Sequence, residues 1–158
     1  MERRDFLGNG SGATAVLWAL ASGFPLSHSA HAQQASGWNK AAFETRSFAE
    51  AARSLGSAGA PMESKDVLLQ APEISENGST VRIGAQSNVP NTTQMAFVVE
   101  KNPSALAAVF DIPAGTDANV SINLKMAQSS NVYVLVKAGD KFFYAVRDVK
   151  VTLGGCSA

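Results

Sequence analysis

The stretch VYVLVKAGDKFFYAVRDVKVTL, residues 132–153, contains the strongest indication of the fold. It holds two apolar runs, 132–137 and 141–153, separated by Ala138-Gly139-Asp140. Runs rich in β-branched and aromatic residues on either side of a glycine-containing turn are typical of a β-hairpin. The stretch therefore predicts two antiparallel strands.

The second run changes the phase of its alternation. One phase contains Phe142, Tyr144 and Val146, and the other contains Val149, Val151 and Leu153. One extra residue in a strand moves the following side chains to the opposite face. We therefore expect a β-bulge around Arg147 and Asp148.

Five more short apolar runs precede this hairpin. They lie at 67–71, 81–86, 94–100, 105–112 and 118–126. Asn77-Gly78 and Pro113-Ala114-Gly115 are expected turns whose glycines can take a positive φ. About seven short strands without a long crossover helix indicate a mainly β fold, an immunoglobulin-like β-sandwich.

Two of these strands are apolar on both alternating faces, at 95–99 and 132–136. Such strands need cover on both sides. Either an N-terminal helix covers one face and the facing sheet the other, or a partner chain covers one face, since an exposed apolar patch would invite association. The sequence leaves both explanations open.

Residues 39–55 predict that N-terminal helix. Phe43, Phe48, Ala51 and Leu55 recur at helical spacing, with charged residues on the other faces. Asn39 is the expected N-cap, and the glycines from residue 56 onward end the segment. We expect one amphipathic helix that packs on the sandwich.

Residues 1–32 have the pattern of a twin-arginine export signal. Arg3-Arg4 is followed by a weak apolar stretch at 13–24 and by Ala30-His31-Ala32, which suits a signal peptidase. The stretch is shorter than the roughly 20 apolar residues of a membrane span. We expect a periplasmic mature chain that starts near Gln33, with one immunoglobulin-like domain at 33–153, a tail at 154–158 and no membrane anchor.

The charge and the histidine content exclude several classes of function. The net charge is zero, and removal of residues 1–32 leaves it balanced, so neither nucleic acid nor a membrane surface is an expected partner. Both histidines, His28 and His31, lie in the expected signal. A mature chain without imidazole lacks the base of a Ser-His-Asp triad and the usual metal ligand. We expect no metal, no cofactor and no enzymatic activity of its own.

The one cysteine, Cys156, directly follows Gly154 and Gly155. A lone thiol cannot form a disulfide within the chain, and two glycines leave the backbone before it free to move. Three residues span about 10 Å beyond Leu153. We expect Cys156 to be a covalent attachment site on a short swinging arm, with Gly154 and Gly155 as its hinge.

Several stretches together resemble the SoxY family, the sulfur-carrier subunits of the periplasmic thiosulfate-oxidizing (Sox) system. They are Arg3-Arg4, APEISENG at 71–78, VVEKNP at 98–103, the run 122–127 that ends in Lys125-Met126-Ala127, and VKVTLGGC at 149–156. The resemblance implies an immunoglobulin-like carrier that pairs with a SoxZ-like subunit in a heterodimer. It also implies that Cys156 holds sulfur intermediates for SoxAX-, SoxB- and SoxCD-like enzymes. Family members usually end in Gly-Gly-Cys-Gly-Gly, whereas Ser157 and Ala158 occupy the last two positions here.

Two other functions stay open at this point. Cys156 could join two exported chains through an intermolecular disulfide, or the chain could be an immunoglobulin-like chaperone or adhesin module whose tail has no role.

Overall fold

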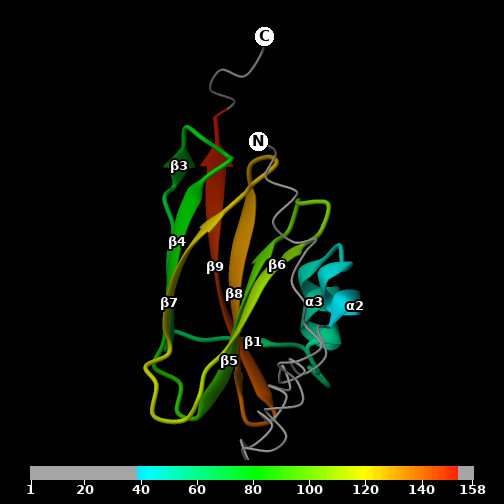
Figure 1. The fold of residues 1–158 in the computed structure, drawn as a ribbon, viewed down its shortest axis with the longest axis vertical. Helices are drawn as coiled ribbons and strands as arrows, with labels where there is room; N and C mark the ends of the chain where they lie inside the picture. Colours follow the sequence, from blue (N-terminus) through cyan, green and yellow to red (C-terminus); the bar gives the residue numbers. More distant parts are fainter. Residues whose placement is uncertain (1–38, 153–158) are drawn as a thin grey trace, which may run out of the picture. The chain divides into compact units, whose positions relative to one another are not determined.

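Two β-sheets pack face to face in residues 39–152, the part of the chain that this computed structural model describes (Figure 1). The expected export signal, the expected hinge residues Gly154 and Gly155, and Cys156 lie outside the described residues. The mainly β, immunoglobulin-like sandwich predicted from the sequence is confirmed.

The larger sheet has the strand order β1–β9–β8–β5–β6, and β3 also pairs with β9. Its strands are β1 (Met62–Glu63), β3 (Ile74–Ser75), β5 (Thr92–Val99), β6 (Leu106–Asp111), β8 (Ser130–Ala138) and β9 (Lys141–Val151). The smaller sheet has the order β2–β4–β7, with β2 (Val67–Gln70), β4 (Val81–Ser87) and β7 (Asn119–Leu124). All seven predicted strands are present. The two additional strands, β1 and β3, have two residues each, which is too short to show alternation.

The inner faces of the two sheets form the main core. The smaller sheet contributes Val67, Leu69, Val81, Ile83 and Ala85, and the larger sheet contributes Met95, Phe97, Val99, Val132, Val134, Val136 and Val149. Alternate residues of each strand supply these side chains, as the period of two in a β-strand requires.

Two helices replace the single helix predicted for 39–55: α2 (Lys40–Phe43) and α3 (Phe48–Ser54). Asn39 caps α2 as expected, because its side chain accepts a hydrogen bond from the Ala42 amide. The break arises because Ser47 starts a new helix: its hydroxyl accepts from the Glu50 amide, and the Glu50 carboxylate accepts from the Arg46 amide. This arrangement is close to a capping box, which defines a helix N-terminus. The prediction of one continuous helix is therefore wrong.

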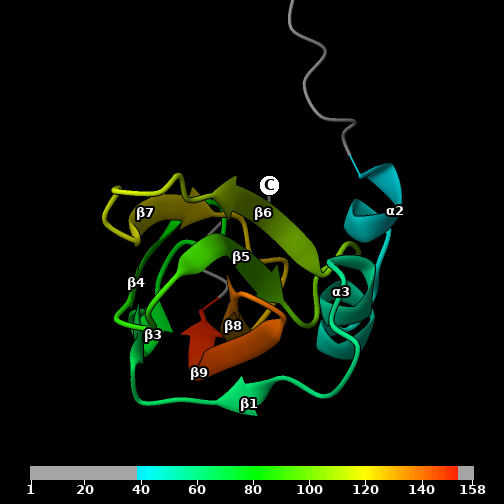
Figure 2. The same ribbon diagram turned by 90° about the horizontal axis from the view of Figure 1, so that it is seen from below.

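The helices lie against the outer face of the larger sheet (Figure 2). They form a second core of small and large apolar residues: Ala42, Ala51, Ala52, Ala96, Val98, Ala105, Leu106, Leu135 and Phe142. Alanines on the helices let them approach the sheet closely. Strands β5 and β8 are thus covered on both faces within the chain, so the helix explanation for their two-sided pattern is confirmed.

Strand β9 contains no bulge opposite β8. Its register is continuous from Ser130↔Val149 to Ala138↔Lys141, so the predicted bulge near Arg147 is wrong. The two phases of its alternation face different cores. Phe142 and Tyr144 belong to the helix side, whereas Phe143, Ala145 and Val149 belong to the core between the sheets. A strand with apolar cover on both faces needs no change of phase.

Two of the three predicted turn glycines adopt a positive φ, with values of 83° at Gly115 and 59° at Gly139. Gly78 does not, and its different role is described below. Within residues 39–152, no helix has the length and apolar character that crossing a membrane would require.

Candidate functional site

The expected carrier tail begins where strand β9 ends. Val151 is the last residue of this strand, and Thr152 is the last described residue. This end of the sandwich also holds β3, the turn before β4 and the segment between β7 and β8 (Figure 1). Cys156, Gly154 and Gly155 lie outside the described residues, so their predicted roles stay predictions.

Strand β3 pairs with the last residues of β9 in parallel, with Ile74 opposite Lys150 and Ser75 opposite Val151. The Lys150 amide donates to the Glu73 carbonyl at 2.9 Å, and the Thr152 amide donates to the Ser75 carbonyl at 3.0 Å. These bonds fix one edge of β9 up to its last described residue.

The opposite edge of the same strand end is held by a side chain. Ser130 and Val149 are the last pair of the β8–β9 ladder. Beyond them, the Ser129 hydroxyl accepts from the Val151 amide at 2.9 Å and lies 3.4 Å from the Val151 carbonyl, to which it donates. The hydroxyl therefore takes the place of a missing strand partner.

Gly78 is required here by close packing. A Cβ atom at this position would lie 2.6 Å from the Met126 carbonyl oxygen and 2.8 Å from Cγ1 of Val151. The Met126 amide also donates to the Gly78 carbonyl at 2.7 Å. Distances below 3.0 Å are not found for real Cβ atoms in contact with backbone, so any other residue would push the turn away from β9.

The neighbouring loops are held together by Asn102. Its side-chain amide donates to the Lys125 carbonyl at 2.7 Å, and its side-chain oxygen accepts from the Ala127 amide at 2.9 Å. The Lys101 amide donates to the Ser130 hydroxyl at 3.0 Å. These bonds fix the loops that surround the end of β9.

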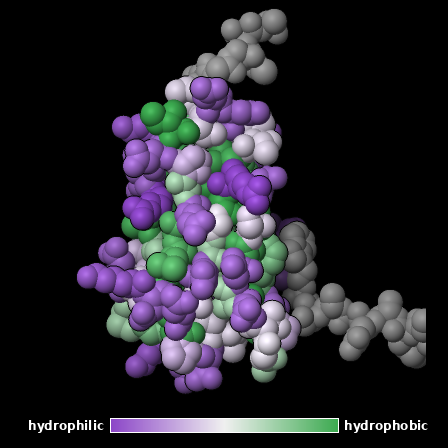
Figure 3. Space-filling view, turned by 90° about the vertical axis from the view of Figure 1, so that its left-hand side faces the viewer, coloured by the Kyte–Doolittle hydropathy of each residue, from purple (hydrophilic) through white to green (hydrophobic). Residues whose placement is uncertain are grey.

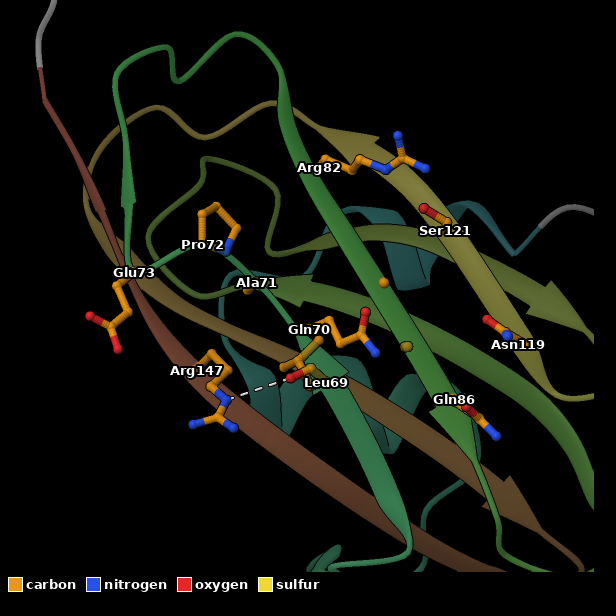
Figure 4. Close-up of a pocket in the computed structure, with 12 residues that line it drawn as sticks. Leu69, Gln70, Ala71, Pro72, Glu73, Arg82, Gln86, Asn119, Ser121 and Arg147 are labelled. Atoms are coloured by element: carbon orange, nitrogen blue, oxygen red, sulfur yellow. Dashed lines mark hydrogen bonds between the residues drawn. The ribbon is translucent and has the colours of Figure 1, made fainter.

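A polar groove of about 850 Å³ lies elsewhere, along the outer face of the smaller sheet (Figure 4). Gly84 lies among the residues that line it, and its polar lining comprises Gln70, Glu73, Arg82, Gln86, Asn119, Ser121 and Arg147. In Figure 4 the side chains of Arg82 and Arg147 do not point toward one another, and the Arg147 Nε donates to the Leu69 carbonyl at 3.5 Å. The sequence analysis did not predict this groove; Gly84 within a strand of alternating polar residues is the signal that could have indicated it.

The surface over this sheet is mainly hydrophilic, with separate hydrophobic areas (Figure 3). The exposed large apolar side chains of residues 39–152 are Met62, Leu68 and Ile74. Among the same residues, no group of three or more His, Cys, Asp or Glu side chains could hold a metal ion.

One titratable group between the helices and the sheet departs from its ordinary behaviour. Burial raises the pKa of Tyr133, and the Glu100 carboxylate raises it further. Phe48 stacks on the Tyr133 ring with 4.4 Å between centroids. The stacked rings join α3 to β8, so Tyr133 contributes to packing between the helices and the larger sheet.

Comparison with known families decides where the chain belongs. The family model described as "Sulfur oxidation protein SoxY" matches residues 51–156, which is more than half of the chain and includes Gly154, Gly155 and Cys156. The chain belongs to the SoxY family. A solved structure of the sulfur carrier protein SoxY from Chlorobium limicola f thiosulfatophilum is similar, with 35% sequence identity and a TM-score of 0.58. The match covers 65% of this chain and 94% of the Chlorobium chain.

Two further solved structures are less similar to this SoxY family member. A chain from a structure of T cell activation by toxic shock syndrome toxin-1 is 14% identical, with coverage of 54% and 99% and a TM-score of 0.40. A lytic polysaccharide monooxygenase from Jonesia denitrificans is 21% identical, with coverage of 47% and 54% and a TM-score of 0.36. Neither bears on the function of this chain. The curated proteins contain no match.

Proposed function

We propose that this SoxY family member is a carrier in thiosulfate oxidation and holds sulfur intermediates covalently on Cys156. The observation that carries the proposal is the extent of the family match, which runs through the stretch Gly154-Gly155-Cys156. The similarity to the Chlorobium sulfur carrier, which extends over nearly all of that protein, supports it further. In this role the chain is a covalent substrate carrier and not an enzyme.

The chemistry follows from the thiol. In loading, the S–H bond of Cys156 breaks and an S–S bond forms between its Sγ and the outer sulfur of thiosulfate. One proton and two electrons leave, and a SoxAX-like enzyme accepts the electrons. In hydrolysis by a SoxB-like enzyme, water attacks the sulfonate sulfur, which leaves as sulfate, and the persulfide stays on Cys156. A SoxCD-like enzyme then oxidises the remaining sulfane sulfur to a second sulfonate, for which three water molecules supply the oxygen atoms and the enzyme accepts six electrons. A second hydrolysis releases this sulfonate as sulfate and restores the Cys156 thiol.

The carrier contributes delivery to these reactions. A cargo attached to a short tail stays at a high effective concentration near each docked enzyme, and no intermediate is released between steps. Glycine permits a wide range of backbone conformations, so Gly154 and Gly155 are the proposed hinge of the tail. Residues 39–152 supply the fixed body from which the tail extends, and a SoxZ-like subunit completes the carrier as a heterodimer.

Intact-mass spectrometry of the freshly isolated, non-reduced protein tests this proposal. The mass is expected to increase by one thiosulfate group after incubation with thiosulfate and the loading enzyme, and by one sulfur atom when the SoxB-like enzyme is added as well. Reduction should remove both increments. A disulfide-linked species of doubled mass as the sole modified form would contradict the carrier role and favour a covalent dimer.

The proposed location is the periplasm, reached through the twin-arginine route that exports folded proteins. Replacing Arg3-Arg4 by Lys-Lys is expected to retain this chain in the cytoplasm, because that route reads the paired arginines. Cell fractionation with immunoblotting measures the distribution. A SoxZ-like partner without its own signal should stay behind as well, and normal export of that partner would contradict transport as a complex.

A further inference from the structure

We infer that Ser75, Gly78 and Ser129 form a clamp that fixes the base of the carrier tail at Thr152 and thereby limits where the cargo can be delivered. The structural part of this inference concerns the end of β9 alone. The consequence for where the tail can present its sulfur cargo rests on the proposed function.

The clamp acts on both edges of the strand end. The final residues of a domain are usually poorly ordered unless bonds tie them down. Here the Ser75 carbonyl holds the Thr152 amide at 3.0 Å from one edge, and the Ser129 hydroxyl holds the Val151 amide at 2.9 Å from the other. Strand β9 therefore stays part of the sheet up to its last described residue.

Gly78, the third member of the clamp, restricts movement of the end of β9 perpendicular to the strand. Gly78 lies so close to the Met126 carbonyl and to Cγ1 of Val151 that even one added carbon would meet both below 3.0 Å. The turn that contains Gly78 thus packs directly on the end of β9. Because Asn102 bonds to Lys125 and Ala127, the surface on the other side of this contact is itself fixed.

A fixed base has a consequence for the reach of the tail. Four residues from Thr152 to Cys156 span at most about 14 Å when fully extended. Strand β9 has 11 residues and is therefore about 36 Å long. The turn at Gly139 lies at the other end of this strand, beyond the reach of the thiol. An enzyme that receives the cargo must consequently approach the end of the sandwich formed by residues 73–80 and 125–130.

Amide hydrogen exchange of the full chain, measured by NMR, tests the clamp. Ser129→Ala removes the hydroxyl, and the amide of Val151 is expected to exchange about three- to tenfold faster, the factor that corresponds to the loss of one net hydrogen bond. Ser129→Thr should restore the slow exchange because it keeps a hydroxyl. Ser79→Ala is the matched control, since it makes the same change on an exposed residue of the neighbouring turn. Equal exchange in Ser129→Ala and Ser79→Ala would overturn the role of Ser129.

A nitroxide attached to Cys156, the one cysteine of the chain, tests the limit on reach. Paramagnetic broadening of amide signals is expected to be strongest at residues 73–80 and 125–130 and much weaker around Gly139. Gly78→Ala should spread the broadening over more of the domain, whereas Gly59→Ala should not, because a Cβ at Gly59 meets nothing within 4 Å. Broadening around Gly139 as strong as that at residues 73–80 in the unaltered chain would overturn the inference.

Neither measurement requires sulfur to be loaded. A chain that shows the expected exchange and broadening but never acquires sulfur adducts would contradict the proposed function and still support the clamp. A chain that loads sulfur but fails both measurements would do the reverse.

Discussion

Cys156→Ala is expected to abolish both the thiosulfate-dependent mass increments and thiosulfate oxidation by the assembled system. The chain contains one cysteine, so no second thiol can accept the sulfur. The loss should be complete, because an S–S bond to the carrier cannot form without a sulfur atom on it. Intact mass and oxygen or electron-acceptor consumption by the reconstituted enzymes measure the two effects.

Two controls separate the loss of the thiol from other effects. Cys156→Ser keeps the size and polarity of the side chain and should fail as completely as Cys156→Ala. Ser157→Gly combined with Ala158→Gly keeps the thiol, introduces the ending usual in the family, and should load sulfur at least as well as the unaltered chain, because it removes side-chain bulk beside the thiol. Thiosulfate oxidation that persists in Cys156→Ala would favour a chaperone or adhesin module with an incidental tail.

The strands were predictable because each carries its own pattern. Seven of them show alternation, or apolar faces on both sides, over at least four residues. The two-residue strands β1 and β3 show neither, and they form because each lies parallel to β9, whereas the chain between them forms β2 of the smaller sheet. The sequence of these two short segments contains no local signal for their pairing with β9.

The two errors in the predicted elements have a common cause. Apolar spacing across 39–55 continues through the break between the helices, but the hydrogen bonds of Ser47 and Glu50 begin a new helix there. In β9 the spacing suggested a bulge, whereas Phe142 and Phe143 pack into different cores. In each case the spacing of the apolar residues was recognised correctly. Contacts with other parts of the chain, which the spacing does not show, decided which structure formed.

The candidate site was likewise predicted only in part from the sequence. Cys156 and the glycines before it were predicted from the sequence, since a single thiol after two glycines is a local signal, and their roles stay predictions. The residues that fix the base of the tail were not. Ser129 lies 22 residues before Val151, and Gly78 lies in the turn between β3 and β4, so only the folded chain brings them to the end of β9.

Phe97→Ala is expected to have the largest effect on stability among single substitutions in the described domain. Phe97 is fully buried in β5 between the two sheets, and its ring meets Phe110 edge-on with 6.0 Å between centroids. Truncation of a buried phenylalanine to alanine costs about 3–5 kcal/mol, because apolar contacts are lost and a cavity remains. Such a loss removes much of the roughly 5–15 kcal/mol that stabilises a typical domain. Urea unfolding followed by circular dichroism gives the free energy of unfolding.

Leu68→Ala provides the control for this measurement. Leu68 also lies on a strand of the sandwich, but its side chain faces outward and is 41% exposed. A substitution on the surface is expected to change the free energy of unfolding by about 0.5 kcal/mol or less. Similar losses for Phe97→Ala and Leu68→Ala would contradict the assignment of the core between the sheets as the main source of stability. A larger loss for Phe97→Ala, with an unchanged dependence on urea, would show that the fixed body from which the tail extends depends on this core.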